Sequence, residues 1–259
     1  MSKSLSWKLL KRIRSKTCLL LTLFCESLST ISGNRTNAPF GAITGYASSN
    51  VPAYSNGNDS YISDQFNCLY GVYTGIKWQC VEYARRWLFI HKGCVFGDVD
   101  GAADIWNLTT VQRVVDQKIF IFKSHPNGSP SPPQNESLVI YTRSSADIPY
   151  GHVSVIVDVL PDYIRVAEEN YDPYYWSGNY SRQIPYVLRQ GMYYIEDNYP
   201  IFGWMTVEDD NQTKPLDQSI IDQIIQLKKT SPDLICLSNA NYYTVSIYCY
   251  VLVIFLYLI

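Results

Sequence analysis

The spacing of apolar residues predicts one clear helix, over residues 78–91. Its apolar positions follow the i, i+4, i+7, i+8 spacing of a helix that buries one face: Cys80, Ala84, Trp87 and Leu88, with Val81 widening the stripe. Gly93 follows it, where a residue in the left-handed conformation commonly ends a helix. A second amphipathic helix is predicted over residues 217–229, and a shorter one over residues 102–108.

Several other segments have the β-branched and aromatic composition of strands. The predicted strands cover residues 138–141, 152–160, 163–167 and 186–194. Pro161-Asp162 separates the second from the third, which predicts a hairpin between them. One helix followed by several antiparallel strands indicates an α+β fold, in which the helix over residues 78–91 packs on an antiparallel sheet.

The composition is that of a folded protein with one main domain. The chain has 259 residues and a formal net charge of −2, and 14% of its residues are aromatic. It is long enough for one domain of about 150–200 residues with terminal extensions. We expect no nucleic-acid partner, because there is no excess of basic residues. No residue cluster predicts a metal or an organic cofactor.

The first 27 residues resemble a secretory signal peptide, with an amphipathic helix as the alternative. A basic segment over residues 7–16 precedes a short apolar run over residues 17–25, and small residues flank Glu26. The chain also contains seven N-x-S/T sequons, where roughly two would be expected by chance. Their asparagines are Asn34, Asn58, Asn107, Asn127, Asn135, Asn179 and Asn211. These features predict a secreted, glycosylated protein.

The C-terminal end has the residue order of a membrane anchor. Small residues at 238–240 precede a mixed spacer and an apolar end over residues 249–259, as in a GPI-attachment signal. The apolar stretch over residues 242–259 is also just long enough to span a membrane. The predicted regions are a signal peptide (1–27), the main domain (33–210), a helix and spacer (211–240) and a hydrophobic tail (241–259).

Four cysteines lie outside the terminal segments: Cys68, Cys80, Cys94 and Cys236. In an oxidising compartment any two of them could form a disulfide. Cys80 lies in the first turn of the predicted helix, where the partial positive charge of the helix N-terminus favours a thiolate. A nucleophilic Cys80 must stay free, and the disulfide that we then predict is Cys68–Cys94. The alternative for Cys80 is a small core residue.

His152 is the predicted partner of Cys80. It begins a predicted strand, at a sheet rim where an imidazole could take the thiol proton and later give it to a leaving amine. The alternative is a half-buried structural histidine. His91 lies at the other end of the helix, about 16 Å from Cys80 at about 1.5 Å per residue. His125 lies in a Pro-rich loop, so both are poor candidates.

A catalytic base needs an orienting group, and Glu168 or Asn170 could serve, unless Glu168 and Glu169 are solvated carboxylates. Glu168 directly follows the second strand of the predicted hairpin. Because side chains alternate along a strand, a simple two-residue turn would point Glu168 away from His152. We therefore predict an odd-length connection or a bulge between the two strands.

The stretch Lys77-Trp-Gln-Cys-Val-Glu-Tyr-Ala-Arg-Arg-Trp-Leu88 resembles the nucleophile helix of the CHAP amidase family, whose fold is papain-like. Five further stretches agree in order: Phe40 to Tyr46, Val51 to Asn56, Gly151 to Val153, Ala167 to Asn170 and Gly203 to Met205. The resemblance covers about residues 39–208. More narrowly, it is to the amidase domains of glutathionylspermidine synthetase/amidase and trypanothione synthetase.

The resemblance implies a cysteine amidase that forms a thioester intermediate. The family's Cys–His–carboxylate triad falls on Cys80, His152 and Glu168, and its oxyanion or substrate contacts fall on Gln79, Arg85 and Asn170. The implied substrate is a glutathionylspermidine-like conjugate or, as for other CHAP domains, a peptidoglycan peptide. We expect no ATP-dependent synthetase activity, because the bifunctional relatives continue into a ligase domain. The alternatives are a general peptidase and a non-catalytic, glycosylated surface protein that binds a ligand.

Overall fold

The computed structural model describes residues 36–58, 60–144 and 147–237. The predicted signal peptide over residues 1–27, the sequon at Asn34 and the predicted tail over residues 241–259 lie outside these ranges. Within the ranges described, no helix is long and apolar enough to cross a membrane.

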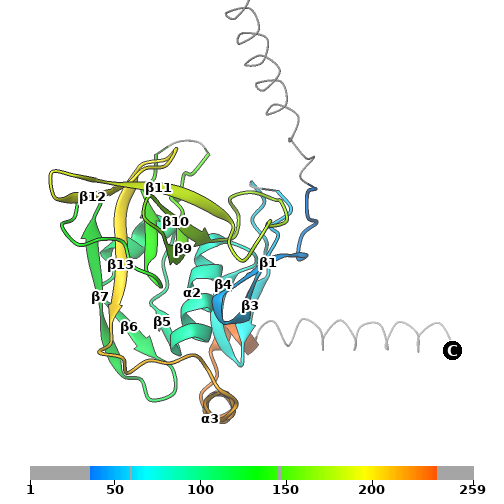
Figure 1. Ribbon diagram of the computed structural model, residues 1–259. Helices are drawn as coiled ribbons and strands as arrows, with labels where there is room; N and C mark the ends of the chain where they lie inside the picture. Colours follow the sequence, from blue (N-terminus) through cyan, green and yellow to red (C-terminus); the bar gives the residue numbers. More distant parts are fainter. Residues whose placement is uncertain (1–35, 59, 145–146, 238–259) are drawn as a thin grey trace, which may run out of the picture. The chain divides into compact units, whose positions relative to one another are not determined.

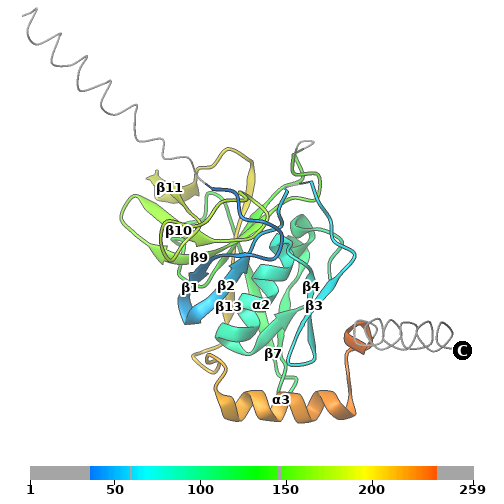
Figure 2. The ribbon, with the colours of Figure 1, turned by 90° about the vertical axis from the view of Figure 1, so that its right-hand side faces the viewer.

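Antiparallel strands make up most of the regular structure in the described part of the chain (Figures 1 and 2). One sheet has nine strands in the order β12-β11-β10-β9-β8-β13-β7-β6-β5, and β1–β2 and β3–β4 form separate pairs. The strands are β1 (Ile43–Ala47), β2 (Val51–Tyr54), β3 (Phe66–Leu69), β4 (Val72–Ile76), β5 (Cys94–Phe96), β6 (Thr110–Arg113), β7 (Ile119–Pro126), β8 (Leu138–Tyr141), β9 (Val153–Val159), β10 (Tyr163–Ala167), β11 (Arg182–Arg189), β12 (Met192–Ile195) and β13 (Ile201–Glu208). The helices are α2 (Cys80–Lys92) and α3 (Gln218–Thr230), with short 3-10 helices η1 (Ser48–Asn50) and η2 (Ala102–Asn107). The predicted α+β class is confirmed.

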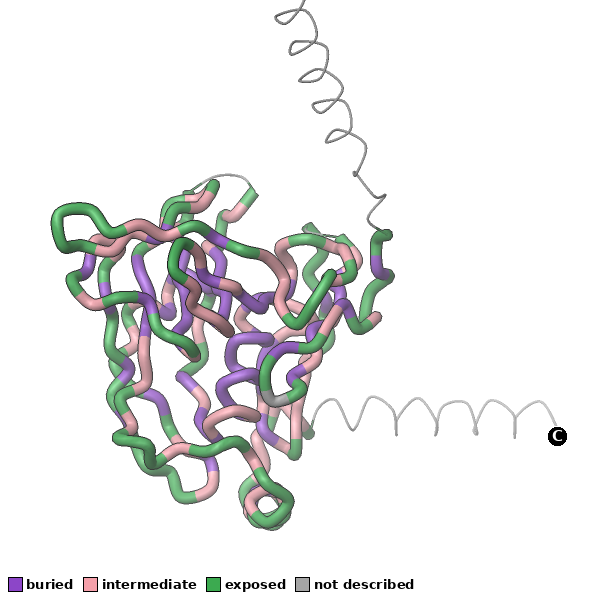
Figure 3. Tube along the Cα trace, viewed as in Figure 1, coloured by how far each residue is buried: buried purple, intermediate pink, exposed green. Residues whose placement is uncertain are grey.

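The central strands of the large sheet are buried on both faces, and Figure 3 shows this buried zone beside α2. In β8, Leu138 and Ile140 belong to the core around α2, whereas Val139 and Tyr141 belong to a second core. Because successive side chains of a strand point to opposite faces, a strand between two cores must be apolar throughout. The uninterrupted apolar sequence of β8 therefore reflects its central position.

Helix α2 is covered on more sides than its sequence pattern predicts. It contacts β9 and β5 of the large sheet, and β4 and β2 of the smaller ones. Nine of its thirteen residues are buried, so the predicted apolar stripe is too narrow. The predicted end of the helix is confirmed, because Gly93 has a φ of 66° and its N–H donates to the Phe89 carbonyl.

The other buried residues of α2 include charged side chains that are joined in one hydrogen-bonded network. Arg86 donates to Glu82 at 2.8 Å and to Glu169, which follows β10, at 2.6 Å. Glu82 also accepts hydrogen bonds at 2.7 Å from Asn67 of β3 and Thr74 of β4. Buried charges are stable only when they are paired and hydrogen-bonded. This network therefore joins α2 to the β3–β4 pair and to the end of β10.

Strands β9 and β10 form the predicted hairpin, and of the two predicted alternatives, an odd-length connection or a bulge, the structure has the bulge. Their pairing shifts by one residue between Arg165 and Val166, which leaves Val157 as the extra residue. With a two-residue turn and no bulge, Glu168 would point to the opposite face of the hairpin from His152. The one-residue shift moves Glu168 to the same face, so the two side chains face each other.

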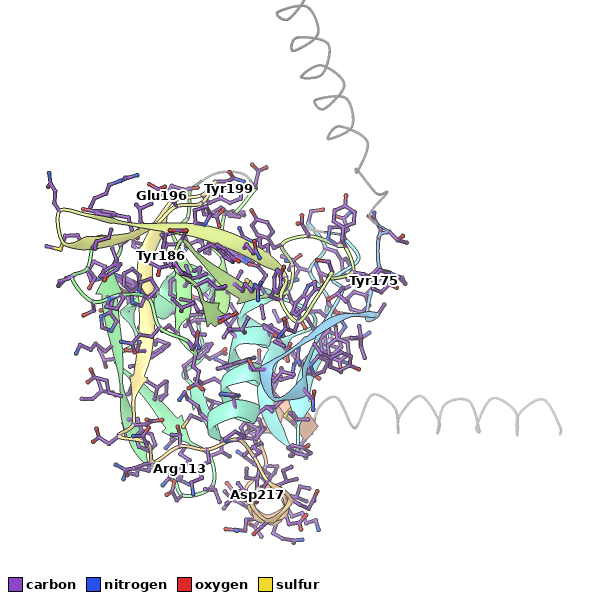
Figure 4. All side chains as sticks on the ribbon, in the orientation of Figure 1. Arg113, Tyr175, Tyr186, Glu196, Tyr199 and Asp217 are labelled. Carbon is purple, nitrogen blue, oxygen red and sulfur yellow. A yellow bond between two sulfur atoms is a disulfide. The ribbon has the colours of Figure 1, made fainter. Side chains whose placement is uncertain are left out.

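Helix α3 confirms the prediction for residues 217–229 to within one residue, and Asp217 (Figure 4) caps it by accepting from the Ile220 N–H. Two other predictions need correction. Residues 102–107 form a 3-10 helix, and the single strand predicted over residues 186–194 is wrong. A turn with positive φ at Gln190 and Gly191 divides that segment into β11 and β12.

The disulfide joins Cys68 to Cys236, so the predicted Cys68–Cys94 bridge is wrong. Cys94 begins β5 and is a buried free thiol. The segment after α3 packs on the β3–β4 pair, where the Asp233 carboxylate accepts from the Tyr73 N–H at 2.9 Å. This contact between distant parts of the chain brings the Cα atoms of Cys68 and Cys236 to 5.9 Å.

Replacing Cys68 and Cys236 together by serine is expected to lower the free energy of unfolding by about 2–5 kcal/mol, because the bridge closes a long loop in the unfolded chain. Urea denaturation monitored by circular dichroism measures the change, with Cys94→Ser as the matched cysteine control. Equal stability of the double variant and the parent protein would show that the bridge does not hold the C-terminal segment.

Candidate active site

Cys80 is the first residue of α2, and its side chain is nearly buried, with 8% of the residue exposed. The first N–H groups of an α-helix have no partner within the helix and carry partial positive charge. The thiol therefore lies where the backbone stabilises negative charge, as the sequence predicts.

A sharp turn before β9 brings His152 to this thiol. Gly151 has a φ of 73°, and a Cβ atom at this position would lie 2.7 Å from the Tyr141 carbonyl oxygen, so the position requires glycine. His152 is buried and hydrogen-bonded to the Cys80 thiol. Its Nε2 atom lies 2.8 Å from Oε2 of Glu168, which leaves the other ring nitrogen for sulfur. The three predicted triad residues are thus in contact.

Glu168 is 2% exposed, and both of its oxygens accept hydrogen bonds. Oε1 accepts from Nε of Arg182 at 2.6 Å and from Oγ of Ser181 at 3.1 Å. Oε2 faces His152 and also accepts from Nη2 of Arg182 at 3.3 Å. The alternative that Glu168 is a solvated carboxylate is therefore wrong.

The charges of these groups support one another. Burial raises the pKa of the Cys80 thiol, but the His152 imidazolium outweighs it, and the pKa lies below its ordinary value. Burial lowers the pKa of His152, but the Cys80 thiolate and the Glu168 carboxylate raise it to about 9. Burial raises the pKa of Glu168, but Arg182 and His152 bring it down to about 2. The negative forms of Cys80 and Glu168 and the positive form of His152 therefore stabilise one another, and a thiolate is the reactive form of cysteine.

Three side-chain amides form a closed ring beside Cys80. Asn170 Nδ2 donates to Gln79 Oε1 at 2.8 Å, and Gln79 Nε2 donates to Asn56 Oδ1 at 3.3 Å. Asn56 Nδ2 completes the ring by donating to Asn170 Oδ1 at 3.0 Å. Gln79 and Asn56 also donate to the Tyr61 carbonyl. The structure thus brings the predicted Gln79 and Asn170 together and adds Asn56.

The site lies in a segment that matches a known domain. Residues 71–170, which include Cys80, His152 and Glu168, match the CHAP domain. The chain contains a CHAP domain. In this domain, α2 supplies the thiol, the residue just before β9 supplies the imidazole, and the residue just after β10 supplies the carboxylate.

Similar proteins carry this region within longer chains. The chain is 35% identical over 175 residues to a trypanothione synthetase of Crithidia fasciculata and 31% identical over 203 residues to the bifunctional glutathionylspermidine synthetase/amidase of Escherichia coli (strain K12). These alignments cover 65% and 74% of this chain. They cover 26% and 33% of the relatives, so the chain spans about a quarter to a third of the length of these curated relatives.

Arg85 is not brought to the site, in contrast to the expectation from the resemblance. Its guanidinium donates to the Gly97 carbonyl at 2.6 Å and to Asp98, and it lies over the rings of Tyr73 and Phe96. Five residues along an α-helix correspond to a rotation of about 140°. Arg85 therefore leaves α2 on a different side from Cys80, and its contacts are those of a packing residue.

The two other histidines of the chain lie elsewhere, as predicted. His91 stacks on Trp87 near the end of α2, and its Nε2 atom lies 2.7 Å from Glu136. His125 lies on β7 and not in the predicted Pro-rich loop, and it is hydrogen-bonded to Thr206 of β13.

Arg182, Tyr141 and Asp197 were not predicted from the sequence. Arg182 binds Glu168, and Tyr141 and Asp197 bind Arg182 and each other. Arg182 begins β11, opposite Val166 of β10, and follows a long loop that has no spacing rule. The part that matches the CHAP domain ends at Asn170, before Arg182 and Asp197. Only the paired strands reveal that these residues belong to the site.

The described sequons differ in their surroundings. Five asparagines are exposed, as N-glycosylation requires: Asn58, Asn107, Asn135, Asn179 and Asn211. Asn127 is partly buried, and its amide both donates to and accepts from the backbone of Ile195. A glycan on Asn127 would have to break this pairing, so Asn127 fits the prediction least well.

Iodoacetamide is expected to alkylate Cys80 in preference to Cys94 below the ordinary thiol pKa, because the pKa of Cys80 is lowered while burial raises that of Cys94 to about 12. Mass spectrometry of peptides from the labelled protein measures both sites, and Cys80→Ser identifies the signal. Labelling of Cys80 only above the ordinary thiol pKa of about 8.5 would contradict the ion pair.

Proposed function

We propose that this chain is a cysteine amidase that hydrolyses an amide bond through a thioester intermediate. The CHAP domain and the relative named as a synthetase/amidase support an amidase or peptidase in general terms. The observation that carries the specific proposal is the hydrogen-bonded series of Cys80, His152 and Glu168, in which a buried carboxylate orients the imidazole beside the thiol. This is the arrangement of a nucleophile, a base and an orienting group.

In the proposed reaction, the Cys80 thiolate attacks the amide carbonyl carbon and forms a C–S bond. The His152 imidazolium then gives its proton to the leaving amine as the C–N bond breaks, which leaves a thioester. His152 next accepts a proton from water, the hydroxyl attacks the thioester, and the acid is released as His152 returns the proton to sulfur. Glu168 remains ionised throughout and stabilises the imidazolium.

The oxyanion formed in each step needs hydrogen-bond donors, and two lie beside the thiol. The Cys80 N–H belongs to the first turn of α2, which leaves it without a partner inside the helix. The Gln79 amide is the second candidate. Its bond to Asn56 is long, at 3.3 Å, and its bond to Tyr61 is shorter, at 3.0 Å. We infer that the Nε2–H group that now donates to Asn56 donates to the oxyanion instead, while Asn170 keeps its hydrogen bond to Oε1 of Gln79.

The proposed substrate is a glutathionylspermidine-like conjugate or a peptidoglycan peptide. The name of the Escherichia coli relative supports the first. The second would suit an enzyme that acts outside the cell. The aromatic loop over residues 171–180 is the proposed determinant of specificity. Tyr171 lies 5.4 Å from the His152 ring, and Tyr175 (Figure 4) is 47% exposed.

We further propose that the protein is secreted, glycosylated and attached to a membrane through a GPI anchor or an apolar tail. The Cys68–Cys236 disulfide supports an oxidising compartment, since such bridges are rare where cellular thiols are kept reduced. The five exposed sequons agree with this location.

The purified protein is expected to release spermidine from glutathionylspermidine, or peptides from purified peptidoglycan, as measured by mass spectrometry. Cys80→Ala should abolish the release, whereas Cys94→Ala should retain it. Activity should decline in acid as Cys80 is protonated, and above about pH 9 as His152 loses its proton. Equal product from Cys80→Ala would refute the proposal, and no product from folded parent protein on either substrate would refute these substrate classes.

A further inference from the structure

Arg182 links the proposed triad to a second buried carboxylate. Its Nε atom donates to Glu168 at 2.6 Å, and its Nη1 atom donates to Asp197 at 2.6 Å. Its Nη2 atom donates to the Tyr141 hydroxyl at 2.9 Å, and that hydroxyl donates in turn to Asp197 at 2.6 Å. One guanidinium therefore holds two carboxylates and a phenol in a fixed arrangement, which a planar fork of donors achieves better than an ammonium.

The rings of Tyr141 and Tyr171 lie against both Arg182 and His152. The guanidinium lies 3.7 Å from the centroid of the Tyr171 ring, and the same ring lies 5.4 Å from the His152 ring. Tyr141, fully buried, lies 5.4 Å from the His152 ring on another strand. The Arg182 side chain is 16% exposed and that of Asp197 is 8% exposed. Water thus screens these charges little, and their interactions are strong.

We propose that Arg182 is a positioning residue, which keeps Glu168 ionised and aligned so that His152 can hold the Cys80 thiolate. This inference rests on the proposed function and extends its triad by one member. The ionised groups then alternate in sign along the series: Cys80 (negative), His152 (positive), Glu168 (negative), Arg182 (positive) and Asp197 (negative).

The need for Arg182 follows from the burial of Glu168. Burial raises the pKa of this carboxyl, and the charge of Arg182 is the largest influence that lowers it. Without that charge, a proton would pass to Glu168 more easily, and His152 would lose the carboxylate that stabilises its positive form. The Cys80 thiolate would lose its counter-charge in turn, so the pKa of the thiol would rise.

The other groups around Glu168 cannot replace this charge. Ser181 supplies one neutral hydrogen bond at 3.1 Å. The pKa values of Tyr141 and Tyr171 are raised by burial, so both side chains are neutral at physiological pH. Asp197 is itself an acid and is paired with Arg182.

The test compares Arg182→Gln, Arg182→Lys and a matched control, Arg189→Gln. Arg189 lies on the same strand, is exposed and pairs with Glu196, so its replacement removes one positive charge from β11 away from the site. The rate of Cys80 alkylation by iodoacetamide is measured against pH, with circular dichroism as the check of folding. This readout needs no substrate.

Arg182→Gln is expected to move the half-maximal pH of alkylation upward by about one unit, which slows the reaction about tenfold at pH values well below the half-maximal pH of the parent. Arg182→Lys keeps the positive charge but lacks the planar set of donors of a guanidinium. Its half-maximal pH is expected to lie between those of Arg182→Gln and the parent protein. Arg189→Gln should match the parent.

A pH profile of folded Arg182→Gln that coincides with the parent profile would overturn the inference, since a purely structural arginine would change stability and not the thiol. If Arg182→Gln does not fold, Arg182→Lys decides: a profile and rate equal to those of the parent would overturn it. A parent protein whose own Cys80 reacts only at the ordinary thiol pH would instead refute the proposed function, so the two failures are distinguishable.

Discussion

The hydrogen bond between His152 and Glu168 is the interaction on which the rest of the site depends. It lies in a buried environment, where an unpaired carboxylate would strongly destabilise the folded state. The fold supplies partners on both sides of it. A thiol at the start of α2 and an arginine at the start of β11 keep both groups charged. The reactive thiol is thus one end of a buried electrostatic network that extends through three strands of the large sheet.

A second network of the same kind holds the helix that presents the thiol. Glu168 and Glu169 are adjacent, and both are buried, but they serve different networks. Glu168 binds His152 and Arg182, whereas Glu169 binds Arg86 of α2 and the Tyr54 N–H of β2. The end of β10 therefore fixes the imidazole and the nucleophile helix at the same time. Asn170, the next residue, joins the amide ring at Gln79, so three consecutive side chains organise the site.

Local patterns were sufficient to predict the parts of this site that depend on neighbouring residues. Helical spacing and Gly93 predicted α2, and strand parity predicted the bulge that turns Glu168 toward His152. Contacts between distant residues could not be predicted in this way. Arg182 reaches Glu168 across a 14-residue separation, and Cys68 reaches Cys236 across 168 residues. Arg85 and Arg86 are neighbours in sequence, yet they enter different networks because a helix turns about 100° per residue.

The most direct test of the central claim is the ultraviolet absorbance of the Cys80 thiolate, titrated against pH in the parent protein and in His152→Ala, with Cys80→Ser subtracted. We predict that the thiolate signal of the parent appears below the ordinary thiol pKa of about 8.5, and that His152→Ala moves it upward toward that pKa. A signal that appears in both proteins at the same pH, near that ordinary value, would contradict the thiolate–imidazolium pair.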